Sequence, residues 1–335
     1  MTNKPSTIFR SFSLYTILKK YFKLILILLI FVLGYLIIEP ILINQIPIEE
    51  NLSSKVNVID FTKNLCPKNQ FDAIKCRKST FESVTSFLCV HDNSRDTGPS
   101  LSIWRDGVWE PNILKFFINQ IKINPDCLIL DVGAQVGQYA IFAAQMGRDV
   151  VSVEPFYDNV LRIQKSVRLN NLEKRIKLVK NAVSNKRGEI KRLEPVYSSI
   201  GAQSLLYHRK EIYTKEEMAE DKYLVETILF DDLIQVLPKN KDGKEYKTAI
   251  LKIDIEGFEP FAFKSASELF ERLDIRVIVM EWGYFAKQKD LVNDVEEMIQ
   301  FLTQRNYEPH QHENQVNLTF DNWKTWPGDV YWIKK

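Results

Sequence analysis

The sequence predicts an α/β fold built on a doubly wound, mostly parallel sheet. From residue 126 onward, short apolar runs alternate with amphipathic stretches, which is the pattern of strands covered by helices on both faces. The segment LILDVGAQVGQYAIFAAQMG shows one such unit: an apolar strand ending at Asp131, a glycine turn through Gly133 and Gly137, and a helix. A second apolar strand follows in VVSVEP and ends at Glu154.

The elements follow one another in a regular order. The body opens with a short extended piece in SIWRDG and an amphipathic helix whose apolar face carries Leu114, Phe117, Ile118 and Ile121. The predicted strands lie near 127–131, 149–154, 176–180, 248–254 and 275–281. The predicted helices lie near 137–146, 157–170, 260–272 and 288–305. The chain ends in a closing strand pair at the sheet edge, with one strand antiparallel to the rest, near 306–311 and 329–334.

One stretch, residues 185–224, interrupts this order. It is long, polar and partly aromatic, where a tight connection would normally serve. Long loops inside compact domains are often lids or binding loops, although a surface insertion without a role has the same appearance. We expect a lid, because the stretch precedes a further acidic strand end.

The loop after the first strand favours one class of nucleotide cofactor. A dinucleotide fingerprint needs G-x-G-x-x-G, so that pyrophosphate rests on backbone at the helix start. Here the loop runs from Gly133 to Gly137 as G-x-x-x-G and lacks the middle glycine. S-adenosylmethionine has no phosphate, and Asp131 and Gln135 can hold its methionine end. Glu154 can accept hydrogen bonds from both ribose hydroxyls, so the sequence predicts S-adenosylmethionine as the cofactor.

The N-terminal segment predicts a membrane anchor. Residues 24–38 are an uncharged apolar run that approaches the length of a bilayer span, with basic residues before it and acidic residues after it. The positive-inside rule then gives a cytosolic tail at 1–20, a signal anchor at 21–38 and a luminal body that begins with a stem at 39–64. A cleaved signal peptide is the alternative, but no small-x-small site follows. We therefore expect a single-pass type II membrane protein of the endoplasmic reticulum or Golgi.

Two further patterns agree with a luminal body. Residues 65–98 form a Cys-bearing cap in which an oxidising compartment would allow a disulfide among Cys66, Cys76 and Cys89; Cys127 is a fourth partner or a buried thiol. Asn51 and Asn317 begin glycosylation sequons. The net charge of +2 and the interspersed charges give no reason to expect a nucleic-acid partner. The pattern leaves the oligomeric state and the disulfide pairing open.

A second acidic region lies in AILKIDIEGFEPFAF. An apolar strand ends at Asp254, Glu256 follows at the turn, and the next strand, IRVIVMEW, ends at Glu281. Ligands of open parallel sheets bind at the carboxyl ends of the strands, so these acids should face the same crevice as Asp131 and Glu154. Like charges brought together raise a pKa and can prepare a general base. For Glu256, the alternative is a cap on the following helix.

The chain resembles the FkbM-type methyltransferases over residues 100–335. The motifs that carry the resemblance are GVWEP, DVGAQVGQYA, VVSVEP, KNAVSN, VETILFDDL, LKIDIEGFE and DVYWIKK. The most specific is K-x-D-x-E-G-x-E, which runs from Lys252 to Glu259. The resemblance implies a Rossmann-like class I fold in residues 99–335 and S-adenosylmethionine-dependent methyl transfer, mostly to hydroxyls of small molecules or sugars.

The resemblance also implies roles for single residues. Asp131, Gly133 and Gly137 would line the methionine side of the cofactor, and Glu154 would hold the ribose. Asn181 and Ala182 would lie near the adenine. Gln135 stands where the family usually has Asn. This longer amide can still form its hydrogen bond if the loop shifts.

Transfer to a hydroxyl benefits from a base that takes its proton. The candidates are Asp254 first, Glu281 second and Glu256 third, with His208 in the expected lid as an outside choice. A metal-assisted alternative would use Asp254 and Glu281 with Mg²⁺ or Ca²⁺, although no ligand spacing demands it. The leading hypothesis is a membrane-anchored luminal O-methyltransferase acting on a glycan or other secretory-pathway hydroxyl. The alternatives are a cytosol-facing enzyme with a small-molecule or lipid acceptor, and an inactive binding module that keeps the fold.

Overall fold

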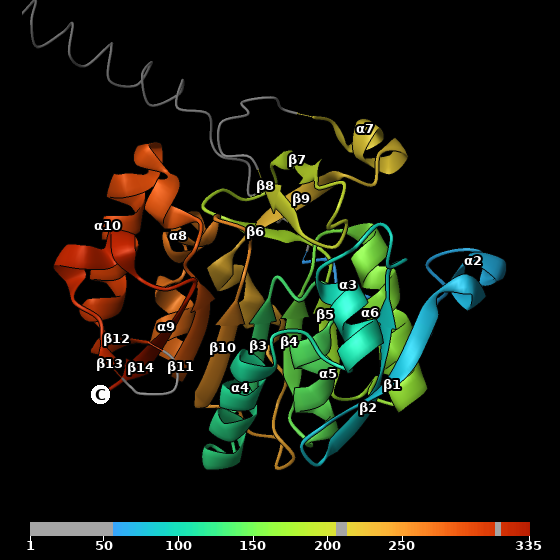
Figure 1. Cartoon of the computed structure of the whole chain (residues 1–335), viewed down its shortest axis with the longest axis horizontal. Coiled ribbons are helices and arrows are strands. Elements are labelled where there is room, and N and C mark those ends of the chain that lie inside the picture. The colour runs from blue at the N-terminus through green and yellow to red at the C-terminus, as the bar shows by residue number, and fades with distance from the viewer. Residues whose placement is uncertain (1–55, 206–212, 312–315) are drawn as a thin grey trace, which may run out of the picture. The chain divides into compact units, whose positions relative to one another are not determined.

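A mixed sheet forms the centre of the described body (Figure 1). The structure is a computed structural model, and it describes residues 56–205, 213–311 and 316–335. Within these residues, parallel strands lie side by side in the order β5 (Ile176–Val179), β4 (Val150–Val153), β3 (Leu128–Val132), β10 (Thr248–Ile253) and β11 (Asp274–Glu281). The sheet continues with β14 (Asp329–Lys334), β12 (Tyr307–Gln311) and β13 (Val316–Asn317), and β14 is antiparallel to β11 and β12.

This topology confirms the predicted doubly wound α/β fold with a mixed sheet, but the antiparallel strand of the predicted closing pair, β14, lies between β11 and β12 and not at the edge. The predicted parallel strands and the closing pair agree with the observed bounds to within two residues. The reason is that these segments are short apolar runs, and β3, β4 and β10 are buried almost without interruption. Strands buried on both faces show such continuous apolar runs.

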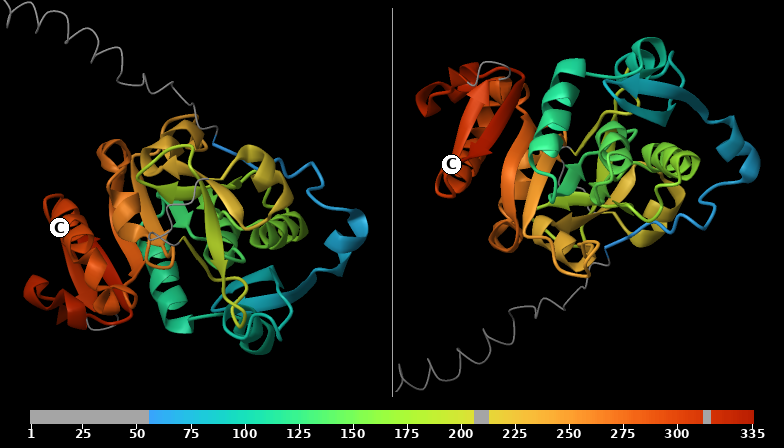
Figure 2. Two further views of the ribbon diagram at one scale, coloured as in Figure 1. Left: turned by 90° about the horizontal axis from the view of Figure 1, so that it is seen from above. Right: turned by 90° about the horizontal axis from the view of Figure 1, so that it is seen from below.

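Helices cover both faces of the sheet, as the views in Figure 2 show. One apolar core lies between the sheet and α4 (Pro111–Ile123), α5 (Gln138–Gln145) and α6 (Tyr157–Asn170). The other lies against η1 (Phe230–Val236), α8 (Glu259–Phe263), α9 (Ser267–Arg272) and α10 (Val292–Thr303). The predicted apolar face of α4 is buried, since all four of its named side chains are fully buried. The packing of the apolar helix faces against the sheet fixes the positions of the carboxyl ends of the strands.

Three predicted elements differ in the structure. The short extended piece is the helix α3 (Pro99–Asp106), because Pro99 suits a first helical turn and the Asp96 carboxylate accepts a hydrogen bond from the Ser100 N–H at 3.1 Å. The single helix predicted near 260–272 is split into α8 and α9. The helix predicted from 288 begins with the short turns η2 (Phe285–Lys287) and η3 (Lys289–Leu291), and α10 starts at Val292.

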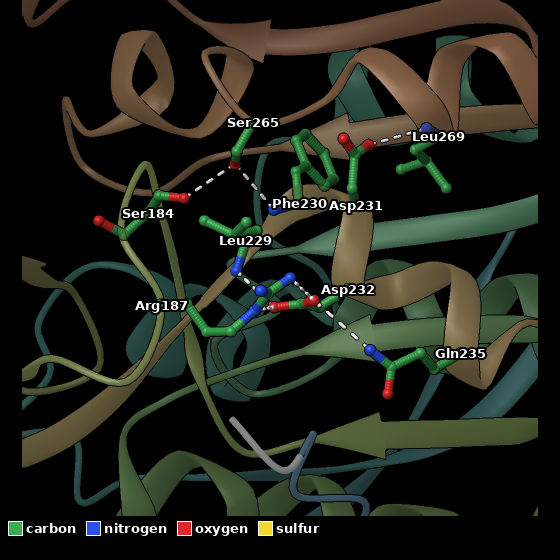
Figure 3. A network of polar contacts seen from close by, with 9 residues as sticks. All are labelled: Ser184, Arg187, Leu229, Phe230, Asp231, Asp232, Gln235, Ser265 and Leu269. Carbon is green, nitrogen blue, oxygen red and sulfur yellow. Dashed lines mark hydrogen bonds and ion pairs between the residues drawn. The ribbon is translucent and has the colours of Figure 1, made fainter. Parts of the chain in front are cut away.

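A polar network explains the break between α8 and α9 (Figure 3). The Ser265 hydroxyl donates to the Ser184 carbonyl and accepts from the Phe230 N–H, both at 2.9 Å. The Asp231 carboxylate accepts from the Leu269 N–H at 2.8 Å, at the start of α9. These long-range hydrogen bonds replace helical ones, and helical periodicity alone gives no sign of them.

A second, smaller sheet lies above the carboxyl ends of the parallel strands in Figure 1. Its strand order is β6 (Ala182–Ser184), β9 (Leu224–Leu229), β7 (Ile190–Pro195) and β8 (Gln203–Leu205), and α7 (Lys215–Glu220) precedes β9. The Arg187 guanidinium makes hydrogen bonds of 3.0 and 2.6 Å with the Asp232 carboxylate, which joins this sheet to η1 (Figure 3). The described part of the stretch predicted as a lid or a surface insertion therefore supplies two of the four strands of this sheet, β7 and β8, and the helix α7.

The segment before α3 packs against the outer face of α5 and α6. It contains α2 (Lys68–Ala73) and a hairpin of β1 (Lys75–Phe81) and β2 (Val84–Val90), whose strands are joined by a Cys76–Cys89 disulfide. Cys66 and Cys127 are buried thiols. This pairing was one of those left open by the sequence.

The predicted anchor, its tail, most of the stem, Asn51 and His208 lie outside the described residues. Among the helices of the described ranges, none combines the length and apolar character needed to cross a membrane.

Candidate active site

A cavity of about 310 Å³ opens where the two sheets meet. Its floor is the carboxyl ends of β3, β4, β10 and β11, and its roof includes Leu193 and Leu205 of the small sheet. The cavity brings together eight of the ten residues predicted for the site: Gly133, Gln135, Glu154, Asn181, Ala182, Asp254, Glu256 and Glu281.

The glycine loop forms one wall of the cavity. Gly133 has φ +83°, and a Cβ built there would lie 1.8 Å from the Asp254 carbonyl oxygen, so no side chain fits. Gln135 also has a positive φ, of 53°, which is uncommon for a residue other than Gly, Asn or Asp. The loop therefore has a left-handed turn that the surrounding structure holds in place.

Glu154 stands at the end of β4 beside this loop. One of its oxygens accepts from the Gln135 N–H at 2.7 Å, and the other accepts from the Phe156 N–H at 2.8 Å. Burial raises the pKa of Glu154 to about 8, although both hydrogen bonds act to lower it. A carboxylate can accept about four hydrogen bonds, so Glu154 keeps acceptor sites directed at the cavity that it lines.

Asp131 and Gly137 support the cavity and are not among its lining residues. The buried Asp131 carboxylate accepts from the Ala140 N–H at 3.0 Å and so fixes the first turn of α5. Burial raises its pKa to about 7. Gly137 has φ +85°, and a Cβ built there would come within 3.0 Å of Ile163 on α6. Both residues thus position the loop through its helix.

The wall opposite the glycine loop is more apolar. It includes Asn181 and Ala182 at the start of the small sheet, together with Val183, Leu193, Leu205 and Phe258. The Asn181 side chain accepts from the Asn57 N–H at 2.8 Å and donates to the Glu226 carbonyl at 3.2 Å. The side chain is therefore held by protein groups, and the apolar lining residues beside it form what we call the apolar slot.

A buried ion pair lies at the polar end of the cavity. Lys252 Nζ is 2.9 Å from Asp254 Oδ2, and the two side chains are 3% and 30% exposed. Burial raises the pKa of Asp254, but the Lys252 charge together with the hydrogen bonds from Glu281 and Lys252 outweighs it, and the pKa of Asp254 lies below its usual value. Asp254 is therefore an ionised carboxylate that borders the cavity at neutral pH.

Glu281 lies next to this ion pair. Burial and the neighbouring Asp254 charge raise the pKa of Glu281 well above its usual range, and its carboxyl shares a hydrogen bond with Asp254. Two like charges in contact cannot both ionise easily. At neutral pH Glu281 is thus the protonated member of the pair and donates to Asp254.

The other two acids of the K-x-D-x-E-G-x-E motif have different surroundings. Glu256 has φ +57° and accepts from the Tyr284 hydroxyl at 2.7 Å, and burial raises its pKa to about 6. Glu259 is fully buried and accepts from the Ile255 N–H at 2.7 Å, so it closes the turn after β10. The helix-cap alternative considered for Glu256 is wrong, because the N-cap of α8 is Phe258 and no side chain caps this helix.

Sequence reasoning missed three lining residues near Lys252. Glu110 accepts from the Tyr139 hydroxyl at 3.3 Å, and burial raises its pKa to about 7. Lys252 Nζ lies 5.3 Å from the centre of the Tyr139 ring. The Gln138 amide accepts from the Trp109 N–H at 2.7 Å and donates to its carbonyl at 2.9 Å. The motif GVWEP contained this signal, because it carries both Trp109 and Glu110.

The comparisons with known proteins support one family. A family profile described as "Methyltransferase FkbM domain" matches residues 131–309. An O-methyltransferase from Bacillus cereus in complex with SAH is 14% identical, with a TM-score of 0.38 over 68% of this chain and 82% of that one. An SAM-dependent O-methyltransferase from Thermotoga maritima is 12% identical, with a TM-score of 0.34 over 68% and 66%. No curated protein sequence matches the chain.

The profile covers more than half of the chain, and its range includes the glycine loop, Glu154 and the acidic strand ends. The cofactor predicted from those residues is the one that this family uses. The chain belongs to the FkbM methyltransferase family and is an S-adenosylmethionine-dependent methyltransferase.

Proposed function

We propose that the protein is a membrane-anchored O-methyltransferase that methylates a hydroxyl of a glycan or another acceptor of the secretory pathway. The observation that carries the proposal is that one cavity holds both Glu154 and the ionised Asp254. The first suits the ribose of the cofactor, and the second suits the proton of an acceptor hydroxyl.

The lining residues fit the cofactor. Backbone of the Gly133 turn and the side chain of Gln135 would hold the amino-acid end, and Glu154 would accept from the ribose hydroxyls. The apolar slot beside Ala182 and Phe258 suits a planar base. When bound, S-adenosylmethionine supplies an electrophilic methyl group on its sulfonium.

Asp254 is the proposed general base. Lys252 keeps it ionised, and the protonated Glu281 orients one side of its carboxylate. An acceptor hydroxyl within hydrogen-bond reach of Asp254 would give up its proton there as the new C–O bond forms. Of the second and third candidates, Glu281 is the protonated partner of Asp254, so Glu256, with a pKa of about 6, is the remaining alternative base. Among the described residues no group of three or more His, Cys, Asp or Glu side chains is arranged to hold a metal ion.

The charge of the lining favours a neutral acceptor. Glu110, Glu154, Asp254, Glu256 and Glu281 all border the cavity, whereas Lys252 is the one cation among the described lining residues and is bound by Asp254. An acceptor with its own carboxylate or phosphate beside the reacting hydroxyl would meet the lining acids that ionise near neutral pH, Glu256 with a pKa of about 6 and Glu110 with a pKa of about 7, and no unpaired cation among the described lining residues. The hydroxyls of neutral sugars meet no such repulsion.

The luminal location is part of the proposal. The apolar run at residues 24–38 with its flanking charges supports a type II anchor, and the Cys76–Cys89 disulfide suits the oxidising lumen of the endoplasmic reticulum or Golgi. A cytosol-facing enzyme is the alternative. Glycan on Asn51 or Asn317, measured by mass shift after deglycosylation of the cellular protein, would favour the lumen; bare sequons with free Cys76 and Cys89 thiols would favour the cytosol.

Calorimetric titration of the purified chain with S-adenosylhomocysteine tests the cofactor site. We expect micromolar binding that is at least tenfold weaker in Glu154→Ala and unchanged in Glu245→Ala, a control on an exposed loop. Binding justifies a screen of methyl acceptors with labelled S-adenosylmethionine, beginning with neutral glycans. A folded chain that binds no cofactor would instead support an inactive binding module.

A further inference from the structure

A short loop closes the cavity from above. Residues 196–202 join β7 to β8, and we call them the roof loop; Ser199, Gly201 and Ala202 of this loop line the cavity. In Figure 1 the loop belongs to the small sheet above the strand ends. A cofactor held at Glu154 lies beneath this loop, so the position of the loop governs access to the site.

The roof loop rests on the segment just before α3. Thr97 donates to the Ser198 carbonyl at 2.8 Å, and Ile200 donates to the Arg95 carbonyl at 3.0 Å. These two backbone hydrogen bonds form an isolated bridge between otherwise irregular segments. The Thr97 hydroxyl also donates to the Ser198 carbonyl at 2.9 Å, and the Ser199 hydroxyl donates to Asp96 at 3.4 Å, so the contact is local to these two segments and uses no hydrogen bond of either sheet.

A side chain from the sheet domain also holds the roof loop. The Asn159 amide, in the first turn of α6, donates to the Gly201 carbonyl at 2.9 Å. The same amide is close enough to the Glu154 carboxyl to lower the pKa of that group. Asn159 thus lies between the carboxyl of the cofactor site and the backbone of the roof.

Asn159 is fixed in this orientation by a buried histidine. His91 Nε2 lies 2.6 Å from the Asn159 oxygen, and both side chains are buried. Because the amide oxygen can only accept, His91 must carry its proton on Nε2. The two contacts agree, since an amide whose nitrogen donates to the Gly201 carbonyl presents its oxygen to His91.

The contact at Gly201 leaves no spare room. A Cβ built on Gly201 would lie 3.2 Å from an Asp96 oxygen and 3.3 Å from both Cγ and Nε2 of Gln135. The roof loop thus touches the glycine loop through Gln135 as well as Glu154 through Asn159. Both contacts involve groups that the cofactor would engage.

We propose that Asn159 is a positioning residue that couples closure of the roof loop to cofactor binding. A ribose held on Glu154 fixes the carboxyl beside Asn159, and the Asn159 amide, which donates to the Gly201 carbonyl, then holds the roof loop in the closed position. Coupling of this kind is reciprocal, so closure of the roof must tighten cofactor binding. The inference rests on the proposed cofactor site at Glu154. It assigns a role to Asn159, a residue that would contact neither the cofactor nor the acceptor.

Hydrogen exchange on the full chain, with and without S-adenosylhomocysteine, tests the coupling. In the wild type we expect the compound to slow exchange both in residues 133–137 and in the roof loop. In Asn159→Ala we expect affinity to fall about tenfold and the protection to remain in 133–137 but disappear from the roof loop. Asn159→Asp should weaken binding further, because its carboxylate would face Glu154 and the Gly201 carbonyl.

Asn170→Ala is the matched control. Asn170 is on the same helix and makes hydrogen bonds of 2.9 Å with the backbone N–H and carbonyl of Phe87, away from the cavity. This variant should lose stability without a change in affinity or in roof protection. Gly201→Ala should uncouple the roof while leaving α6 intact, which covers the case in which Asn159→Ala does not fold.

The outcomes separate the two proposals. Wild-type affinity and roof protection in both Asn159→Ala and Gly201→Ala would refute the coupling and leave the cofactor site standing. Absence of S-adenosylhomocysteine binding in the folded wild type would refute the cofactor site at Glu154 and the coupling with it.

Discussion

Removal of the buried cation at the active site should destabilise the protein strongly. Lys252→Met keeps most of the side-chain volume and deletes the charge that lies 2.9 Å from Asp254. At an effective dielectric constant of ~20, this separation corresponds to an attraction of ~6 kcal/mol. Part of it is offset by desolvation, and breaking a buried pair by removal of one partner typically costs about 3–5 kcal/mol. We expect a loss of that size in the free energy of unfolding near neutral pH.

The loss should depend on pH in a defined direction. The pKa of Asp254 is lowered in the folded protein, so its contribution to stability is present above the unfolded pKa, 3.8, and disappears as the pH falls through the folded value. Without Lys252, burial and its acidic neighbours would raise the pKa of Asp254, and its ionisation would then destabilise the fold. The difference between wild type and variant should therefore be larger at about pH 7.5 than at about pH 4.5.

Urea unfolding at the two pH values measures this difference, with Lys264→Met as control. Lys264 lies 2.6 Å from Asp294 and 2.8 Å from Glu297, but its side chain is 33% exposed. Solvent screens such pairs, so the control should lose about 1 kcal/mol or less. Equal losses in the two variants, or a Lys252→Met loss that does not change with pH, would refute the assignment of a buried ion pair.

Three further predictions concern single features of the site and the cap. Glu281→Gln should keep the hydrogen bond to Asp254. Its stability relative to wild type should increase as the pH rises from about 5 to 8, because the raised pKa of Glu281 makes its ionisation destabilising in the wild type. Urea unfolding that shows no such increase would argue against a protonated Glu281. Gly133→Ala should abolish S-adenosylhomocysteine binding in calorimetry, because its Cβ would lie 1.8 Å from a backbone oxygen; binding at wild-type affinity would show that the loop can move. The Cys76→Ser/Cys89→Ser double variant should lose about 3 kcal/mol of unfolding free energy, as the sequence separation of 13 gives in the chain-entropy model, and should still bind cofactor.

The sequence predicted the parts of the fold that depend on local pattern. The strands that end at Asp131, Glu154 and Asp254 are continuous apolar runs followed by glycine or polar turns, and this pattern has few other solutions. Their meeting at one edge followed from the rule for parallel sheets, so most of the predicted site residues line the cavity.

The parts that it could not predict depend on contacts between distant segments. The break at Ser265 rests on hydrogen bonds to Ser184 and Phe230, 81 and 35 residues away. The small sheet pairs β6 with β9 across the whole predicted lid, and strands of only three to six residues give weak periodicity. For the same reason Asn159 appeared only as a helical residue, since its partners His91 and Gly201 are 68 and 42 positions away.

The segment before the hairpin has a practical consequence for the boundaries of the domain. Residues 57–59 lie along the outer side of β5: Ile59 donates to Leu178 at 2.8 Å and Lys180 donates to Asn57 at 2.8 Å. They cover an edge that would otherwise offer unpaired backbone groups to other chains. A fragment trimmed to the family match at 131–309 would expose this edge and strip α4 from the core, and it should aggregate. A soluble fragment for biochemistry therefore has to begin before Val56 and retain β14.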